Sequence, residues 1–279
     1  MAHMIGEAAR YTTGQSVRIF QRMLITTMLM IAALGVFEGA LISFCVLRWG
    51  HTSWVHISFI LLGVVGAFYL CQYQSRQIDH YERERKKWRK GAVGECMVSD
   101  VLSALSDEYW VINDITTDSG NLDHVVVGPT GVFAIETKHW RGTVAAGSDG
   151  ELVLNGKATS TPNVGQLVRR TMAVREQVIA LTRRDELFIK AVMVFPRARV
   201  DALFGTTSHV HCLTDERVCD YIEDPRFARK LNPEQIDQIA RAFKGIAEMD
   251  VEFSATSMAA VNRSKSEPSV VASVAPNLL

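Results

Sequence analysis

Residues 121–138 read NLDHVVVGPTGVFAIETK, with two apolar runs on either side of the turn sequence Gly128-Pro129-Thr130-Gly131. Apolar, β-branched runs bounded by glycine and proline predict the two strands of a β-hairpin. If the loop keeps an even register, Asp123 lies directly across from Glu136, on one face and with Cβ atoms about 5 Å apart. Lys138 follows Glu136 by two residues, so the strand period puts it on the same face. A bulge at Gly131 would instead shift the register by one residue.

Two carboxylates that face each other repel unless something compensates their charge. Hard carboxylate oxygens suit Mg²⁺ or Mn²⁺, which makes a divalent cation the natural compensation. A lysine beside the cation and a phosphate can hold the attacking water or offset charge on the phosphorus oxygens. Asp123, Glu136 and Lys138 therefore predict metal-assisted phosphodiester hydrolysis, with Asp123 and Glu136 as the metal ligands.

The simpler alternative for a Glu-x-Lys pair is a solvated salt bridge between strands. The flanking residues, however, are apolar on both faces of each run, which is typical of strands inside a sheet. They are Val125, Val126, Val127, Phe133, Ala134 and Ile135. Charged side chains at the end of a buried strand need a partner or a metal, and this context favours the functional interpretation.

The same stretch, with its surroundings, resembles a known family. Gly94-Glu95 and residues 111–115, 120–133 and 135–142 are similar to the nuclease-related domain, NERD, and the resemblance covers roughly residues 91–201. That family resembles the PD-(D/E)xK nucleases in fold and site. The resemblance implies an α/β fold with an αβββαβ core, in which Asp123, Glu136 and Lys138 are the D…ExK residues.

The resemblance also implies two further catalytic residues. Glu95 matches the acid on the first helix, and Gln166 matches the glutamine often found on the helix after the hairpin. Each has a plainer alternative, because acids are common in a first helical turn and glutamine is an ordinary residue of helix surfaces. Three arginines are candidates for binding nucleic-acid phosphates, with solvated arginines as the alternative: Arg141, Arg169 and Arg170.

Composition limits the partners. The 30 Lys and Arg residues balance 30 Asp and Glu, so attraction to nucleic acid must come from local clusters. Five cysteines without CxxC spacing predict neither a disulfide framework nor a zinc knuckle. His124 and His139, which flank the acids, are predicted to be core or hydrogen-bonded histidines rather than metal ligands. Met1-Ala2-His3-Met4 resembles the remnant of an expression tag and is left out of the predicted fold.

Two apolar stretches precede the predicted domain. Residues 23–47 carry one charge, Glu38, and residues 54–73 carry no formal charge. Each is long enough to cross a hydrocarbon core of about 30 Å, which predicts a transmembrane hairpin in the lipid bilayer. A pair of buried helices in a soluble protein is the alternative. Glu38, among small residues, predicts helix packing or a homo-oligomer formed through the hairpin.

Positive charge predicts the orientation. Three arginines precede the first stretch and seven Lys or Arg residues lie in residues 76–90, whereas the connecting residues 48–53 hold only Arg48. Lys and Arg accumulate in cytoplasmic segments. We therefore predict a multi-pass protein of the inner (cytoplasmic) membrane, with both termini and the nuclease-like domain in the cytoplasm and the loop outside.

The predicted organisation has five parts. The basic segment is assigned to the anionic inner leaflet rather than to a DNA groove, with Trp88 docked at the membrane surface. The tail is predicted to be disordered because it is rich in serine, alanine and valine and contains Pro268 and Pro276. The parts are residues 1–22, cytoplasmic N-terminus; 23–74, transmembrane helical hairpin; 75–90, basic juxtamembrane helix; 91–250, NERD nuclease-like domain; and 251–279, tail.

Two functions remain open at this point, with a third class beside them. The first is a membrane-anchored nuclease that uses Mg²⁺ or Mn²⁺ to cleave DNA at the cytoplasmic membrane face. The second is an inactive nuclease-like domain that binds nucleic acid or a protein partner there. A two-span sensor or scaffold is the third. The presence of Asp123, Glu136 and Lys138 favours the nuclease, because a binding module has no need of two opposed acids.

Overall fold

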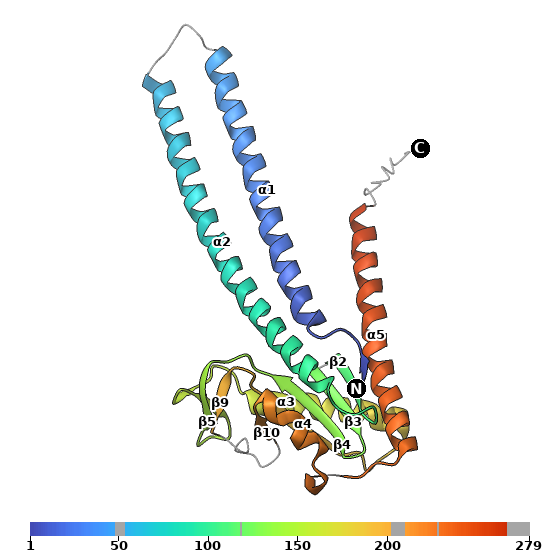
Figure 1. Ribbon diagram of the computed structural model, residues 1–279. Coiled ribbons are helices and arrows are strands. Elements are labelled where there is room, and N and C mark those ends of the chain that lie inside the picture. The colour runs from blue at the N-terminus through green and yellow to red at the C-terminus, as the bar shows by residue number, and fades with distance from the viewer. Residues whose placement is uncertain (48–53, 118, 202–209, 228, 267–279) are drawn as a thin grey trace, which may run out of the picture.

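The structure is a computed structural model that describes residues 1–47, 54–117, 119–201, 210–227 and 229–266 (Figure 1). Two long helices, α1 (Arg10–Leu47) and α2 (Trp54–Leu102), lie side by side and extend well beyond a sheet-containing domain. The predicted mixed α/β fold with N-terminal helices is confirmed at this level.

The domain is built on a six-stranded sheet of order β1-β2-β3-β4-β8-β10. The three central strands β2, β3 and β4 are antiparallel, and the remaining pairings are parallel. The strands are β1 (His3–Ile5), β2 (Trp110–Thr117), β3 (Gly120–Gly128), β4 (Gly131–Thr137), β8 (Ile189–Val194) and β10 (Val210–Leu213).

Helices cover both faces of this sheet. On one face, α3 (Asn163–Thr182) and α5 (Pro233–Ser266) pack against residues such as Ile112 and Val125. On the other face, the end of α2 and α4 (Asp215–Glu223) pack against residues such as Phe133. The two apolar faces of β3 and β4 are thus both buried, as their sequences predict.

The element order gives the core its layout. The end of α2, then β2, β3 and β4, then α3 and β8 follow one another as helix, three strands, helix and strand. A small second sheet of order β7-β6-β5-β9 lies beside the core; β5, β6 and β7 are inserted between β4 and α3, and β9 follows β8. A 3₁₀ turn, Pro225–Phe227, follows α4. The strands of this second sheet are β5 (Gly142–Ala146), β6 (Leu152–Leu154), β7 (Lys157–Ala158) and β9 (Ala198–Val200).

Two predicted divisions, after residue 74 and after residue 90, fall within one helix, because α2 runs without a break from Trp54 to Leu102. No proline interrupts residues 54–102, and the good helix formers around Gly91 and Gly94 offset their cost of about 1 kcal/mol each. Gly94 also has a packing role. A Cβ there would lie 2.8 Å from the Cβ of His139, so glycine lets α2 approach the loop that follows β4.

Two terminal predictions also need correction. His3 and Met4, left out of the predicted fold, form β1 together with Ile5. This strand pairs with β2, whose outer edge would otherwise expose unpaired backbone groups. His3 stacks on Trp110 with ring centroids 4.6 Å apart. At the other end, α5 continues to Ser266, within the predicted disordered tail 251–279. No proline occurs until Pro268, so nothing ends the helix earlier; residues 267–279 lie outside the described ones.

The helices α1 and α2 contact each other along a narrow seam. Gln74 Nε2 donates to Thr27 Oγ1 at 3.2 Å, and a Cβ on Gly63 would lie 2.9 Å from the Phe37 ring. Among the described residues, one helical segment, Arg10–Leu41, is long and apolar enough to cross a membrane. The predicted two-span hairpin is therefore not confirmed, and its loop, residues 48–53, lies outside the described residues.

Candidate active site

The hairpin of β3 and β4 keeps the even register on which the predicted site depends. Its pairs run from Gly128 opposite Gly131 to His124 opposite Ile135. The next residue on each strand beyond the last pair is Asp123 on β3 and Glu136 on β4, and the charge of Glu136 raises the pKa of Asp123. Gly131 has a φ of +128°, a conformation that glycine adopts readily, so the turn closes without the one-residue shift that a bulge would cause.

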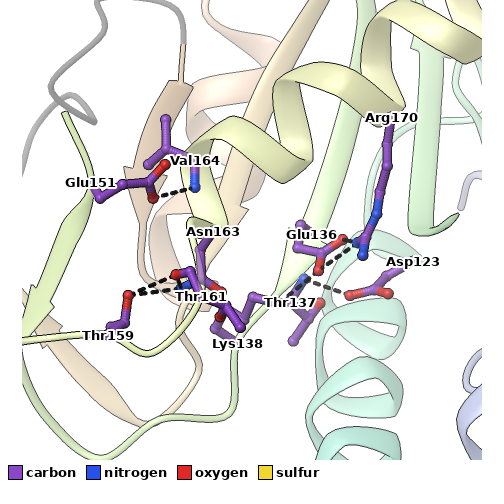
Figure 2. Close-up of polar contacts among 10 residues, drawn as sticks. All are labelled: Asp123, Glu136, Thr137, Lys138, Glu151, Thr159, Thr161, Asn163, Val164 and Arg170. Carbon is purple, nitrogen blue, oxygen red and sulfur yellow. Dashed lines mark hydrogen bonds and ion pairs between the residues drawn. The ribbon is translucent and has the colours of Figure 1, made fainter. Parts of the chain in front are cut away.

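Glu136 is held by two cations. Lys138 Nζ donates to Glu136 Oε1 at 2.7 Å, and Arg170 Nη1 donates to both carboxylate oxygens at 3.1 and 3.0 Å. Figure 2 shows Asp123, Glu136 and Arg170 converging from β3, β4 and α3. The Glu136 side chain is 7% exposed, so these charge-assisted bonds are poorly screened by solvent.

Asp123 lies beside this cluster, with the negative charges of Glu136 and Glu95 nearby. Its Oδ2 accepts a hydrogen bond from the Thr137 backbone N–H at 2.6 Å. Burial raises the pKa of Asp123 well above its usual range, and the nearby charges of Glu136 and Glu95 raise it further. A carboxyl group in this setting holds a proton unless a cation compensates its charge.

Glu95 faces the same cluster from α2. Burial, and then the charge of Asp114, raise the pKa of Glu95 to about 7. The Thr12 hydroxyl, at the start of α1, donates to Glu95 Oε2 at 3.3 Å. The structure thus brings Glu95 together with the predicted D…ExK residues, and links all of them to the N-terminal segment.

Asp114 is a site neighbour that the sequence analysis missed. It lies in β2 with a φ of +60°, uncommon for a residue other than glycine, and its Oδ2 accepts the Tyr11 N–H at 2.6 Å. Burial raises its pKa. No local pattern identifies Asp114, because its partners Arg10 and Tyr11 lie more than 100 residues away in the sequence.

Glu95, Asp123, Glu136, Lys138 and Arg170, but not Asp114, line a cleft with a volume of about 770 Å³ that we call the acid cleft. Of the other predicted residues, Gln166 lies one helical turn before Arg170 on α3 but does not line the cleft, and neither do Arg141 and Arg169. The residues of the acid cleft that carry the argument below are Tyr11, Lys87, Trp88, Lys90, Glu95, Asp123, Glu136, Lys138 and Arg170.

The start of α3, and with it Arg170, is fixed by the inserted sheet. Glu151 accepts the backbone N–H groups of Val164 and Gly165 at 2.8 and 2.9 Å, and Figure 2 shows its carboxylate at that helix end. A carboxylate at a helix N-terminus satisfies unpaired donors and complements the helix dipole. Arg170 therefore reaches Glu136 from a firmly held helix.

The two histidines that flank the acids, His124 and His139, both have a lowered pKa, which favours their neutral form. His124 is fully buried and its Nδ1 lies 2.8 Å from Asn113 Oδ1. Burial lowers its pKa to about 3, so it is a neutral, hydrogen-bonded core histidine. Burial also lowers the pKa of His139, as do the charges of Arg197 and Arg141.

The donor set fits a hard divalent cation. Asp123 and Glu136 present carboxylate oxygens close enough for the charge of Glu136 to raise the pKa of Asp123, the condition that a bound cation relieves. In the described part of the chain no three or more His, Cys, Asp or Glu side chains group as a metal site. Mg²⁺ commonly takes one or two protein carboxylates and completes its shell with water and substrate oxygens, so the pair is sufficient.

Known proteins match the part of the chain that carries this site. Residues 90–196 match the family described as the nuclease-related domain, NERD. An uncharacterized protein from Bacillus anthracis is 39% identical over 64 residues, which are 21% of this chain and 30% of that protein. The chain therefore spans under a third of that relative's length. No solved structure matches.

Proposed function

We propose that the protein is a membrane-anchored, metal-dependent nuclease that hydrolyses phosphodiester bonds of DNA at the cytoplasmic membrane face. The observation that carries the proposal is the opposition of two buried acids, Asp123 and Glu136, in a cleft that also holds Lys138 and Arg170. A module that only binds nucleic acid gains nothing from carboxylates beside phosphate, because the like charges repel.

Each residue has a role in this proposal. Asp123 and Glu136 would hold Mg²⁺ or Mn²⁺, which activates water and neutralises charge on the phosphate. Lys138 would stabilise the charge that develops on the phosphorus oxygens in the transition state. Arg170 would orient a neighbouring phosphate, since its guanidinium already reaches into the cleft. Glu95, with a pKa of about 7, would accept or donate a proton near neutral pH.

A second candidate rests on the ion pairs of Glu136. Lys138 and Arg170 already neutralise this carboxylate without a metal. An inactive nuclease-like domain that binds nucleic acid or a protein partner would keep such pairs permanently closed. In the nuclease, by contrast, Lys138 and Arg170 would separate from Glu136 when the cation and the substrate bind.

Cleavage assays distinguish the two candidates. The full chain, in detergent, should cleave DNA with Mn²⁺ or Mg²⁺ and not with EDTA. The full chain is required because Thr12 contacts Glu95. Arg170→Ala should lower cleavage about tenfold or more, whereas Arg169→Ala, which removes an exposed arginine outside the cleft, should match the parent. Salt-sensitive DNA binding without cleavage would favour the inactive module, and equal effects of the two variants would exclude this cleft.

The exposed apolar surface of α1 and α2 supports the membrane anchor. Large apolar side chains point away from the shared seam on both helices, among them Met28, Leu29, Leu62 and Phe68, each more than half exposed. Such a surface is costly in water and favourable in lipid. We propose that both helices cross the inner membrane, with the domain in the cytoplasm.

Reporter fusions test this topology. Because Lys and Arg accumulate on the cytoplasmic side, a reporter fused after Lys90 should be active only in the cytoplasm. A tag in residues 48–53 should be accessible from outside. Release of the protein from membranes by carbonate, or the reverse labelling pattern, would contradict the proposed anchor.

A further inference from the structure

The wall of the acid cleft opposite β4 is built from α2, in the segment that the sequence assigns to the membrane surface. Lys87, Trp88 and Lys90 line the cleft together with Glu84, and Tyr11 joins them from α1. α2 rises 1.5 Å per residue, so Trp88 lies about 20 Å beyond Gln74, where the proposed span ends. A helix that leaves the membrane along its own axis therefore carries Trp88 to the catalytic acids and away from the bilayer.

The wall contains two aromatic side chains, Tyr11 and Trp88, that both line the cleft. Tyr11 and Trp88 meet edge to face, with ring centroids 6.3 Å apart and planes at 71°. In an edge-to-face pair, the ring that contributes its edge keeps both of its faces free of the partner ring. Tyr11 is 41% exposed although it is a large aromatic side chain. Exposed aromatic rings beside cations are the usual platform for unstacked bases.

The two lysines are available to bind phosphate. Lys86, which does not line the acid cleft, is paired with Glu82 at 3.2 Å. Lys87 and Lys90 form no ion pair with any residue that the structure describes, and both are exposed. A strand whose phosphates contact these lysines and Arg170 would lie in the same cleft as the acids.

The size of the acid cleft argues against a duplex. Its volume of about 770 Å³ falls in the range typical of sites for small ligands. DNA duplexes are stiff over about 150 base pairs and keep their bases stacked inside. A duplex therefore cannot easily bend into this cleft or place an unstacked base on the aromatic wall. A single strand can do both.

We infer that the cleft takes single-stranded nucleic acid, with phosphates on Lys87 and Lys90 and a base stacked on the Trp88–Tyr11 pair. This inference rests on the proposed function and adds to it the strandedness of the substrate. The segment of α2 from Lys87 to Lys90 is then part of the substrate site.

Binding in Ca²⁺, a cation chosen to limit turnover, tests the inference. The full chain in detergent is titrated with a fluorescent oligothymidylate and with a blunt duplex of equal length. The single strand should bind at least about tenfold more tightly than the duplex. Trp88→Ala should weaken single-strand binding about tenfold and leave duplex binding unchanged, whereas Trp88→Phe, which keeps an aromatic face, should retain most of the affinity.

The lysines provide a matched pair of variants that does not depend on the aromatic residues. Lys87→Ala should reduce the slope of log affinity against log salt by roughly 0.7, the value for one phosphate of a single strand. Lys86→Ala, its neighbour outside the acid cleft, should leave the slope unchanged. Equal slopes for the two variants would overturn the phosphate assignment.

The failure of this inference is distinguishable from the failure of the proposed function. Metal-dependent cleavage of duplex and single strands at equal rates, with Trp88→Ala lowering both, would overturn the inference and leave the nuclease standing. Selective, Trp88-dependent binding of single strands without cleavage would support the inference and remove the catalytic proposal. Absence of nucleic-acid binding in every condition would overturn both.

Discussion

Replacement of Lys138 by alanine is expected to lower DNA cleavage about 10²-fold or more, the scale on which one transition-state stabiliser is lost. The variant should bind Mn²⁺ equally well or slightly better. Lys138 Nζ lies 2.7 Å from Glu136 Oε1 and so competes with a cation for that oxygen. DNA affinity in Ca²⁺ should fall only slightly, because one phosphate contact among several is removed.

Lys230→Ala is the matched control for this variant. Lys230 is exposed and lies beside the Gly128–Gly131 turn, at the other end of the hairpin from Glu136. Single-turnover cleavage and Mn²⁺ calorimetry on the same preparations separate loss of chemistry from loss of metal. If Lys138→Ala cleaves as fast as the parent, the activity belongs to another site or to a contaminant.

Asp123→Asn is expected to weaken Mn²⁺ binding by at least about 100-fold and to abolish cleavage. Even partners one shell further from a metal commonly contribute 10- to 100-fold to its affinity, and Asp123 is proposed as a direct ligand. Isothermal calorimetry of the full chain measures the change. Asp100→Asn, which alters an exposed acid on α2, should bind as the parent does. Unchanged binding in the Asp123 variant would exclude the proposed metal site.

The pH dependence of Mn²⁺ binding follows from the same carboxyl group. Burial, then Glu136 and Glu95, raise the pKa of Asp123 in the folded protein, and a proton must leave before a metal binds. Mn²⁺ affinity should therefore rise with pH. The folded protein holds the proton of Asp123 more tightly than the unfolded chain does, so the contribution of Asp123 to stability should fall as pH rises above about 4. Buried His124 contributes in the opposite direction, so the measurement is the difference in Tm between Asp123→Asn and the metal-free parent, which should shift in favour of the variant as pH rises from about 4 through 7. A difference in Tm between variant and parent that stays constant over that range would contradict the raised pKa of Asp123.

The hairpin was predictable because its determinants are local. The turn at Gly128–Gly131 and the period of two residues fix which side chains of β3 and β4 share a face, whatever packs around them. The apolar residues on both faces likewise predict burial in the centre of a sheet. The position of Lys138 was predictable for the same reason, because it lies at the same strand end as Glu136. In the structure the two side chains form an ion pair, with Lys138 Nζ 2.7 Å from Glu136 Oε1.

Arg170 could have been separated from Arg169 by the same kind of reasoning. The buried residues of α3 include Leu167, Thr171 and Val174, which follow the helical period. Arg170 stands three residues after Leu167 and four before Val174, so it flanks this buried stripe. Arg169 stands about 100° away around the helix and faces solvent. Periodicity in α3 was therefore the missed signal.

Sequence alone determined the facing acids, the lysine beside them, the order of helix and strands, and the apolar character of the N-terminal helices. Each of these follows from side-chain period or composition within about twenty residues. Tertiary structure decided that α2 runs unbroken from residue 54 to residue 102, which brings Lys87 and Trp88 into the acid cleft. It also decided that Thr12 contacts Glu95 and that the Asp114 carboxylate accepts the Tyr11 N–H at the start of α1, pairings separated by 83 and 103 residues. No local pattern encodes such contacts, because they exist only once the chain has brought distant segments to the same face of the sheet.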